Sequence, residues 1–296
     1  MQSLYRIEMD FRSDWSNFQM KELKRMGYEI GSLDTNEISL KYFNLLKRYI
    51  SSVPRKIHFA QNFECPKSLK EGFNVLIRKI ELGEEINPNL SRNLKKIDYK
   101  DMLLNDWGIH HLHLGVEIDD DGFVNRDRKK TDSNYVLFVR FTDSDAYLIK
   151  IGKHGEWGDD SLVQLIHDSW PDTIESCKIN GISTRKINNK QRQEARKAGS
   201  LTAISVEDGT VYYPIGMGYT TTGTSIEALK SSDGMLDLID SFEDSIKENI
   251  NHIIKTFKEA GLQIHEELKF ILQFENEELY AREVNSNGIV LMNSID

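Results

Sequence analysis

Apolar residues in the first hundred positions recur at helical spacing. One run extends from Phe18 to Gly27, a second from Asn36 to Pro54 and a third from Leu69 to Gly83. In the second run Leu40, Phe43, Leu46 and Ile50 stand three or four positions apart, and a glycine or a proline ends each run. The pattern predicts an N-terminal helical region over residues 1–100.

The period changes to that of β-strands between residues 101 and 177. Residues 107–117 and 147–151 have the pattern of strands, and residues 135–141 are rich in β-branched and aromatic side chains. Residues 118–134 are too polar to be buried, which indicates a long hairpin loop. The three segments predict an antiparallel meander, and residues 160–169 predict a short helix after it. We therefore expect a central antiparallel-sheet domain that contains a short helix.

The last third of the chain alternates between strand and helix patterns. Residues 178–200 are basic and polar and contain no apolar run, so we expect a linker there. Residues 201–215 predict a hairpin that turns at Asp208 and Gly209. A helix over 236–260 and two strands within 268–284 complete a predicted C-terminal α+β domain over residues 201–296. The whole chain is predicted to be α+β.

Composition narrows the functional classes. The chain has 296 residues, and its 38 basic and 47 acidic side chains give a net charge of −9, which opposes a generic nucleic-acid coat protein. Residues 1–100 run against this trend with 18 basic and 13 acidic side chains. This basic segment either faces phosphates or is an ordinary solvated surface. The two cysteines, Cys65 and Cys177, exclude a disulfide scaffold and a four-cysteine zinc site.

The location is predicted from what the sequence lacks. The first residues do not show the basic and then apolar order of a signal peptide. No stretch approaches the roughly 20 apolar residues of a membrane span. We expect a cytoplasmic protein with no membrane partner.

Histidines are concentrated in the central region. Five of the eight fall within 58 residues, at positions His110, His111, His113, His154 and His167. Imidazole exchanges protons near neutral pH and also binds metals. Strand alternation places His111 and His113 together on one face, predicted to be accessible if Leu112 faces the core. His110 would then lie against the core and have a structural or supporting role.

The segment after the third predicted strand adds further candidates. His154 lies in Gly152–Gly158, a glycine-flanked loop of the kind that often carries functional groups. In this loop Lys153 could contact a phosphate, and Trp157 could stack on a base.

His167 is predicted to pack or orient other groups. Arg126 and Arg128, in the long hairpin loop, are candidate phosphate ligands, although a solvated loop commonly carries such charges.

These residue types fit RNA cleavage without a metal. A base removes the proton of the 2′-hydroxyl, an acid protonates the leaving 5′-oxygen, and cations stabilise the phosphate between them. His111 and His154 would be base and acid, in either order. His113 would orient them or share the role, and Arg128 would stabilise the phosphate. No cofactor and no metal is required.

The central pattern resembles a known class of proteins. The segment WGIHHLHLG is followed by R-x-R, a β pair, H-x-x-W and WP. Over residues 20–172 this order resembles the RelE-like branch of the barnase/EndoU/colicin/RelE class of ribonuclease toxins, and proteins of bacterial toxin and phage-defence loci. The resemblance implies an endoribonuclease that acts as a toxin effector, with RNA as its substrate and an antitoxin or defence protein as a partner.

Two other functions remain open. His111, His113 and His154 could bind a metal that activates water, in a metal-dependent nuclease or phosphohydrolase. Alternatively, the chain could be a sensor or binding module without catalysis. The Gly/Thr segment over residues 216–225 is not a Walker-type phosphate loop and reads as a flexible loop, because no Gly-Lys-Ser/Thr follows it.

Overall fold

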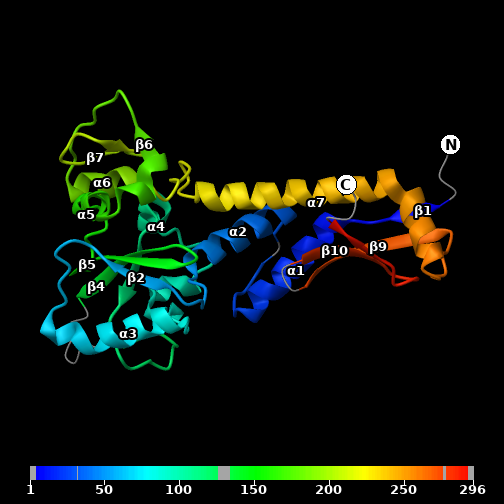
Figure 1. The fold of residues 1–296 in the computed structure, drawn as a ribbon, viewed down its shortest axis with the longest axis horizontal. Coiled ribbons are helices and arrows are strands. Elements are labelled where there is room, and N and C mark those ends of the chain that lie inside the picture. Colours follow the sequence, from blue (N-terminus) through cyan, green and yellow to red (C-terminus); the bar gives the residue numbers. More distant parts are fainter. Residues whose placement is uncertain (1–4, 32, 126–133, 276–277, 293–296) are drawn as a thin grey trace. The chain divides into compact units, whose positions relative to one another are not determined.

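The computed structural model describes residues 5–31, 33–125, 134–275 and 278–292, and its mixture of helices and sheets confirms the α+β class. The chain forms two compact units (Figure 1). The first combines Met1–Phe43 with Lys230–Asp296, and the second is the continuous segment Asn44–Leu229. The boundaries fall within helices α2 (Thr35–Arg48) and α7 (Ile226–Glu259).

The first unit is built on a mixed sheet. Its strands are β1 (Arg6–Glu8), β9 (Glu267–Glu275), β10 (Glu278–Glu283) and β11 (Ile289–Leu291), in that spatial order. β1 runs parallel to β9, and the other pairs are antiparallel. Apolar side chains of α1 (Phe11–Arg25) and α7 share a core with this sheet.

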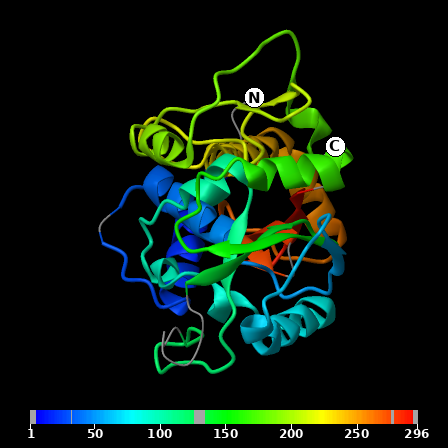
Figure 2. The ribbon, with the colours of Figure 1, turned by 90° about the vertical axis from the view of Figure 1, so that its left-hand side faces the viewer.

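The second unit contains the predicted meander. β3 (His110–His113), β4 (Tyr135–Phe141) and β5 (Asp145–Lys153) pair antiparallel, as expected. A strand not predicted from the sequence, β2 (Lys56–Phe59), adds to β5 in parallel. Helices α3 (Lys70–Leu82) and α5 (Ser161–Ser169) flank this sheet (Figures 1 and 2), and α4 (Met102–Trp107) leads into β3.

The segment expected to be a linker is folded. It contains β6 (Lys178–Ile179) and α6 (Asn189–Lys197), which begins with a capping box at Asn188. β6 forms a small sheet with β8 (Val211–Tyr212) and β7 (Ile204–Ser205), which are the predicted hairpin. Four 3-10 turns cover Lys67–Leu69, Asn87–Asn89, Arg92–Lys95 and Pro171–Cys177.

The compact units divide the chain differently from the predicted series of residues 1–100, 101–177, 178–200 and 201–296. Local patterns define consecutive segments, whereas β1 pairs with β9 across most of the chain length, so the two ends belong to one unit. α7 also begins ten residues earlier than predicted. Its first turns contain Gly234 and several small polar residues, and each such residue weakens the helical signal without preventing a helix.

No helix in the described part of the chain is both long and apolar enough to cross a membrane.

Candidate functional site

The end of α4 sets the position of the histidine strand. Asp101 caps the helix by accepting a hydrogen bond from the Leu104 backbone N–H at 3.1 Å, and Gly108 ends it with φ at 66°. Only a residue that tolerates this left-handed conformation can end the helix here. Ile109 is then fully buried, and β3 starts with the next residue. Register on β4 places His111 opposite Phe138 and His113 opposite Val136.

The three predicted site histidines and Trp157 lie together. The ring centroid of His111 is 6.0 Å from that of His113 and 6.3 Å from that of His154. His113 and His154 are 5.9 Å apart. The Trp157 ring is 4.5 Å from His111 and 4.8 Å from His154. Side chains that are more than 40 positions apart in the sequence therefore form one cluster.

Burial within this cluster differs from the expectation of an accessible strand face. His111 is 7% exposed and His113 is 3% exposed, so both are buried, because the loop that follows β5 brings His154 and Trp157 onto the His111 side of β3. His154 is the exposed member. Of the three, His111 and His154 line a cavity, whereas His113 does not.

Helix α6 holds the loop that carries His154 and Trp157. Gln193 donates a hydrogen bond to the Gly155 carbonyl at 3.0 Å, and Arg196 donates one to the Trp157 carbonyl. The Gly158 N–H donates to Asn189 Oδ1 at 3.0 Å. A Cβ on Gly158 would lie 2.7 Å from the Asn189 carbonyl oxygen, so this close approach requires glycine. The segment expected to be a linker thus positions the candidate site.

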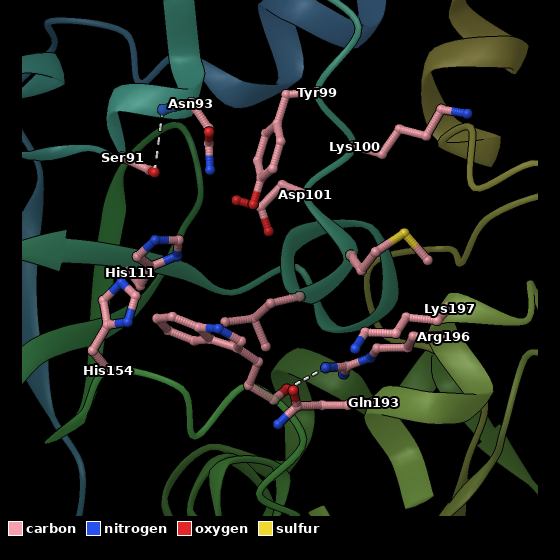
Figure 3. Close-up of a pocket in the computed structure, with 13 residues that line it drawn as sticks. Ser91, Asn93, Tyr99, Lys100, Asp101, His111, His154, Gln193, Arg196 and Lys197 are labelled. Atoms are coloured by element: carbon pink, nitrogen blue, oxygen red, sulfur yellow. Dashed lines mark hydrogen bonds between the residues drawn. The ribbon is translucent and has the colours of Figure 1, made fainter. Parts of the chain in front are cut away.

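We refer to the space beside these side chains as the histidine cavity. Its volume is about 240 Å³. Figure 3 shows the His111 and His154 rings side by side at one end and Lys197 at the other. The lining residues come from the 3-10 turn at 92–95, from the segment that leads into α4, and from α4, β3, the loop after β5 and α6. They are Ser91, Asn93, Tyr99, Lys100, Asp101, Met102, Leu103, His111, His154, Trp157, Gln193, Arg196 and Lys197.

Cationic groups outnumber carboxylates in the histidine cavity. Lys100, Arg196 and Lys197 line it, against one acidic residue, Asp101. Lys100 and Lys197 are exposed, and the Lys100 ammonium also donates to the Thr222 carbonyl. This balance favours an anionic ligand.

Arg196 is the buried cation of the cavity. It is 4% exposed, its Nε donates to Asp106 Oδ2 at 2.8 Å, and its guanidinium carbon lies 4.3 Å from the Trp107 ring centroid. Burial raises the pKa of the Asp106 carboxyl, and Arg196 and Arg192 oppose that rise. Nη2 of Arg196 is buried, and no residue in the described part of the chain accepts a hydrogen bond from it. A donor of this buried cation is therefore left unused.

Tyr99 contributes a neutral donor. Burial raises the pKa of its phenol to about 12, with a smaller contribution from the Asp101 charge. The hydroxyl therefore stays protonated at neutral pH and can donate a hydrogen bond to a bound ligand.

The remaining predicted residues lie elsewhere. His110 lines a different cavity, described below. His167 bonds through Nδ1 to the Tyr212 hydroxyl at 2.7 Å and does not line the histidine cavity. Lys153 is exposed and does not line it either. Arg126 and Arg128 lie outside the described residues.

The described residues contain no group of three or more histidine, cysteine, aspartate or glutamate side chains arranged to hold a metal ion. His111, His113 and His154 therefore do not form the metal-binding group that the metal-site alternative requires.

Comparisons with protein-family models, curated proteins and solved structures found no match to this chain. The site is therefore defined by its own geometry.

Sequence reasoning missed the contribution of Tyr99, Lys100, Arg196 and Lys197. The signal available for Arg196 and Arg192 was their spacing of four positions within a helix-forming segment, which places them on one helical face.

Proposed function

We propose that this protein is a metal-independent endoribonuclease whose active site is the histidine cavity. The observation that carries the proposal is the pairing of His111 and His154 on one cavity with lysine and arginine side chains. Two imidazoles can supply a base and an acid at neutral pH, and the cations can stabilise the charge that develops on a phosphate.

In this mechanism one imidazole takes the proton of a ribose 2′-hydroxyl. The 2′-oxygen attacks the adjacent phosphorus, and the bond to the 5′-oxygen breaks. The other imidazole donates a proton to that leaving oxygen, which produces a 2′,3′-cyclic phosphate and a free 5′-hydroxyl. Either His111 or His154 serves as the base, and the other serves as the acid.

Other side chains have supporting roles in this proposal. Three cationic side chains of the described residues attract and hold the RNA phosphate: Lys197, Lys100 and Arg196. Trp157 offers a partly exposed ring on which an unpaired base can stack. His113 contacts both histidine rings and orients them. Arg126, Arg128 and Lys153 remain predicted phosphate ligands.

The biological role in the proposal is that of a toxin effector in bacterial phage defence, held in check by an antitoxin or a defence partner protein. It rests on the sequence pattern that resembles ribonuclease toxins. The predicted consequence is growth arrest on expression of the wild-type chain and not of a catalytically inactive variant.

The decisive experiment is incubation of the purified protein with total RNA in EDTA. Wild-type protein should cleave RNA, and His154→Ala should lower the rate by about 10²–10⁴-fold, the usual contribution of a positioned acid or base. His111→Ala should have an effect of the same order. His154 is exposed, so its loss leaves the core intact, and circular dichroism checks the fold of the more buried His111 variant.

A matched control removes a histidine outside the cavity. His252 is exposed on α7, and His252→Ala should cleave at the wild-type rate. Cleavage that requires added divalent metal would replace the proposal with a metal-dependent nuclease. If His111→Ala and His154→Ala both cleave RNA at the wild-type rate, the histidine cavity is not the active site. If the wild-type protein cleaves no RNA, a binding module is favoured.

A further inference from the structure

A second cavity lies within the same compact unit, and we refer to it as the arginine cavity. Its volume is about 410 Å³. The residues that matter for its chemistry are Lys47, Arg55, His110, Arg140, Phe141 and Glu227. Adjacent residues of β3 serve the two cavities, because His110 lines this one and His111 lines the other. The proposed ribonuclease mechanism uses none of these six residues.

Arg140 is the most informative group. Its hydrogen bond runs from Nη1 to the Thr173 carbonyl at 3.2 Å, and no described carboxylate lies within ion-pair distance of its guanidinium. Burial lowers its pKa. A guanidinium has five N–H donors, so most of the donor capacity of Arg140 is unused. A partly buried charge without a counterion is costly unless a ligand supplies one.

Two further cations line the same space. Arg55 is 7% exposed, and its hydrogen bonds run to the Thr142 carbonyl and to Ser51. It forms no ion pair with a described residue. Burial lowers the pKa of both Arg55 and Lys47.

The carboxylates of this cavity do not neutralise Arg140. Glu227 is paired with the Lys47 ammonium at 2.7 Å. Asp143 also lines the cavity, but it is exposed, and its charge acts on Arg55. Three cations and two carboxylates therefore leave a positive cavity, with Arg140 as its uncompensated member.

His110 adds an unsatisfied polar group. Both of its ring nitrogens are buried and have no hydrogen-bond partner among the described residues. Its ring lies edge-on to Phe141, with 5.6 Å between the ring centroids. Buried polar atoms are rarely left without partners in folded proteins, so these nitrogens in the lining of a cavity are available to hydrogen-bond a ligand.

The rest of the wall is apolar. The Arg55 guanidinium carbon lies over the Phe141 ring, 5.2 Å from its centroid. Leu46 and Met217 are exposed apolar residues of the lining. A volume of this size suits a small organic molecule better than a bare ion. The positive charge and the apolar wall of this cavity together favour a ligand with an anionic end and an apolar or aromatic body.

We propose that the arginine cavity binds a small organic phosphate of mononucleotide size, with Arg140 as its principal phosphate ligand. A guanidinium matches two phosphate oxygens at once, which makes phosphate the oxyanion best suited to the free donors of Arg140. The apolar wall formed by Phe141, Leu46 and Met217 contacts the organic part. This inference is independent of the ribonuclease activity proposed for the histidine cavity.

The test is calorimetric titration of the full-length protein with defined probes. These are adenosine and uridine 5′-monophosphate, ribose 5-phosphate, inorganic phosphate, and the two nucleosides. At least one organic phosphate should bind with one equivalent per chain, and the nucleosides should not bind. Binding of inorganic phosphate alone would overturn the organic class, and no binding by any probe would overturn the site.

Variants locate the binding. Arg140→Gln should weaken it by roughly tenfold or more, the usual effect of losing a charged hydrogen-bond partner. Leu46→Glu places a negative charge on the exposed lining without disturbing the core, and it should weaken binding about threefold or more beyond the effect of the neutral Leu46→Gln. Lys197→Gln, in the histidine cavity, should leave affinity unchanged. Equal affinity in Arg140→Gln and Leu46→Glu, or loss of binding in Lys197→Gln, would overturn the assignment.

Discussion

His110 and His111 are adjacent on β3, yet their side chains meet different surroundings. His111 lies beside the rings of Trp157 and His154 at the histidine cavity. His110 contacts Phe141, and burial lowers its pKa to about 4. Alternation along a strand is sufficient to separate a candidate catalytic group from a histidine that stays neutral at physiological pH.

The low pKa of His110 predicts a loss of stability in mild acid. Burial is its main cause; His111, Lys47 and Arg55 act in the same direction, and Asp101 opposes them. Below pH about 6.5 His110 is protonated in the unfolded chain, whereas in the folded chain it is protonated only below pH about 4. The contribution of neutral His110 to the free energy of unfolding is therefore present at neutral pH and is lost as the pH falls from about 6.5 to about 4.

Urea unfolding at pH 7 and pH 5 measures this effect. Between pH 7 and pH 5 the free energy of unfolding of the wild-type protein should fall by about 2 kcal/mol more than that of His110→Gln, because glutamine does not titrate. Comparing the two proteins cancels the other titrating groups. An equal loss in both would show that His110 is not held neutral in the folded state.

The residues of the candidate site were predictable only in part. His111, His154 and Trp157 could be selected because strand and loop patterns place chemically active side chains near one another. Their burial could not, because it depends on which loop covers β3. Arg196 and Tyr99 approach from segments with no apolar pattern, and their role depends on tertiary contacts alone.

At the scale of elements, a buried ion pair joins α4 to α6. Asp106 is fully buried and Arg196 is 4% exposed, and they bond at 2.8 Å. Loss of either partner leaves the other as an unpaired buried charge, which typically costs about 3–5 kcal/mol. We expect Asp106→Asn and Arg196→Met each to lower the free energy of unfolding by an amount of this order.

A double-mutant cycle separates the pair from the rest of the site. The double variant should cost less than the sum of the single variants, with a coupling of about 1–3 kcal/mol. Lys255 and Glu259 form an exposed pair on α7 with 72% and 67% of their side chains accessible, and Lys255→Met should change stability by less than about 0.5 kcal/mol. Additive costs for Asp106 and Arg196 in chemical denaturation would show that the two are not coupled.

The elements differ in how well their sequence reveals them. β4 and β5 carry strong β-formers separated by a clear turn, so their pairing could be predicted. β2 was missed because its four residues, KIHF, are too short for a periodic signal. α6 was missed because its buried face consists of Arg192 and Arg196, and a search for apolar periodicity counts both as solvent-facing.

At the scale of the whole molecule, the two compact units differ in their dependence on chain continuity. The unit Asn44–Leu229 is one continuous segment that contains its own core and both cavities. The other unit needs both ends of the chain, because β1 pairs with β9. Only the continuous unit can be produced as a single uninterrupted fragment.

We expect the fragment Asn44–Leu229 to fold and to unfold in one cooperative thermal transition. The fragment 101–177, which the sequence pattern defines as the central domain, should show none. It retains β3, β4 and β5, but it lacks β2 beside β5 and lacks Arg196, so Asp106 would be a buried charge without its partner. Circular dichroism melts of the two fragments provide the comparison. A cooperative transition in 101–177, or its absence in Asn44–Leu229, would show that stability follows the local sequence pattern more closely than the tertiary contacts that α6 and β2 provide.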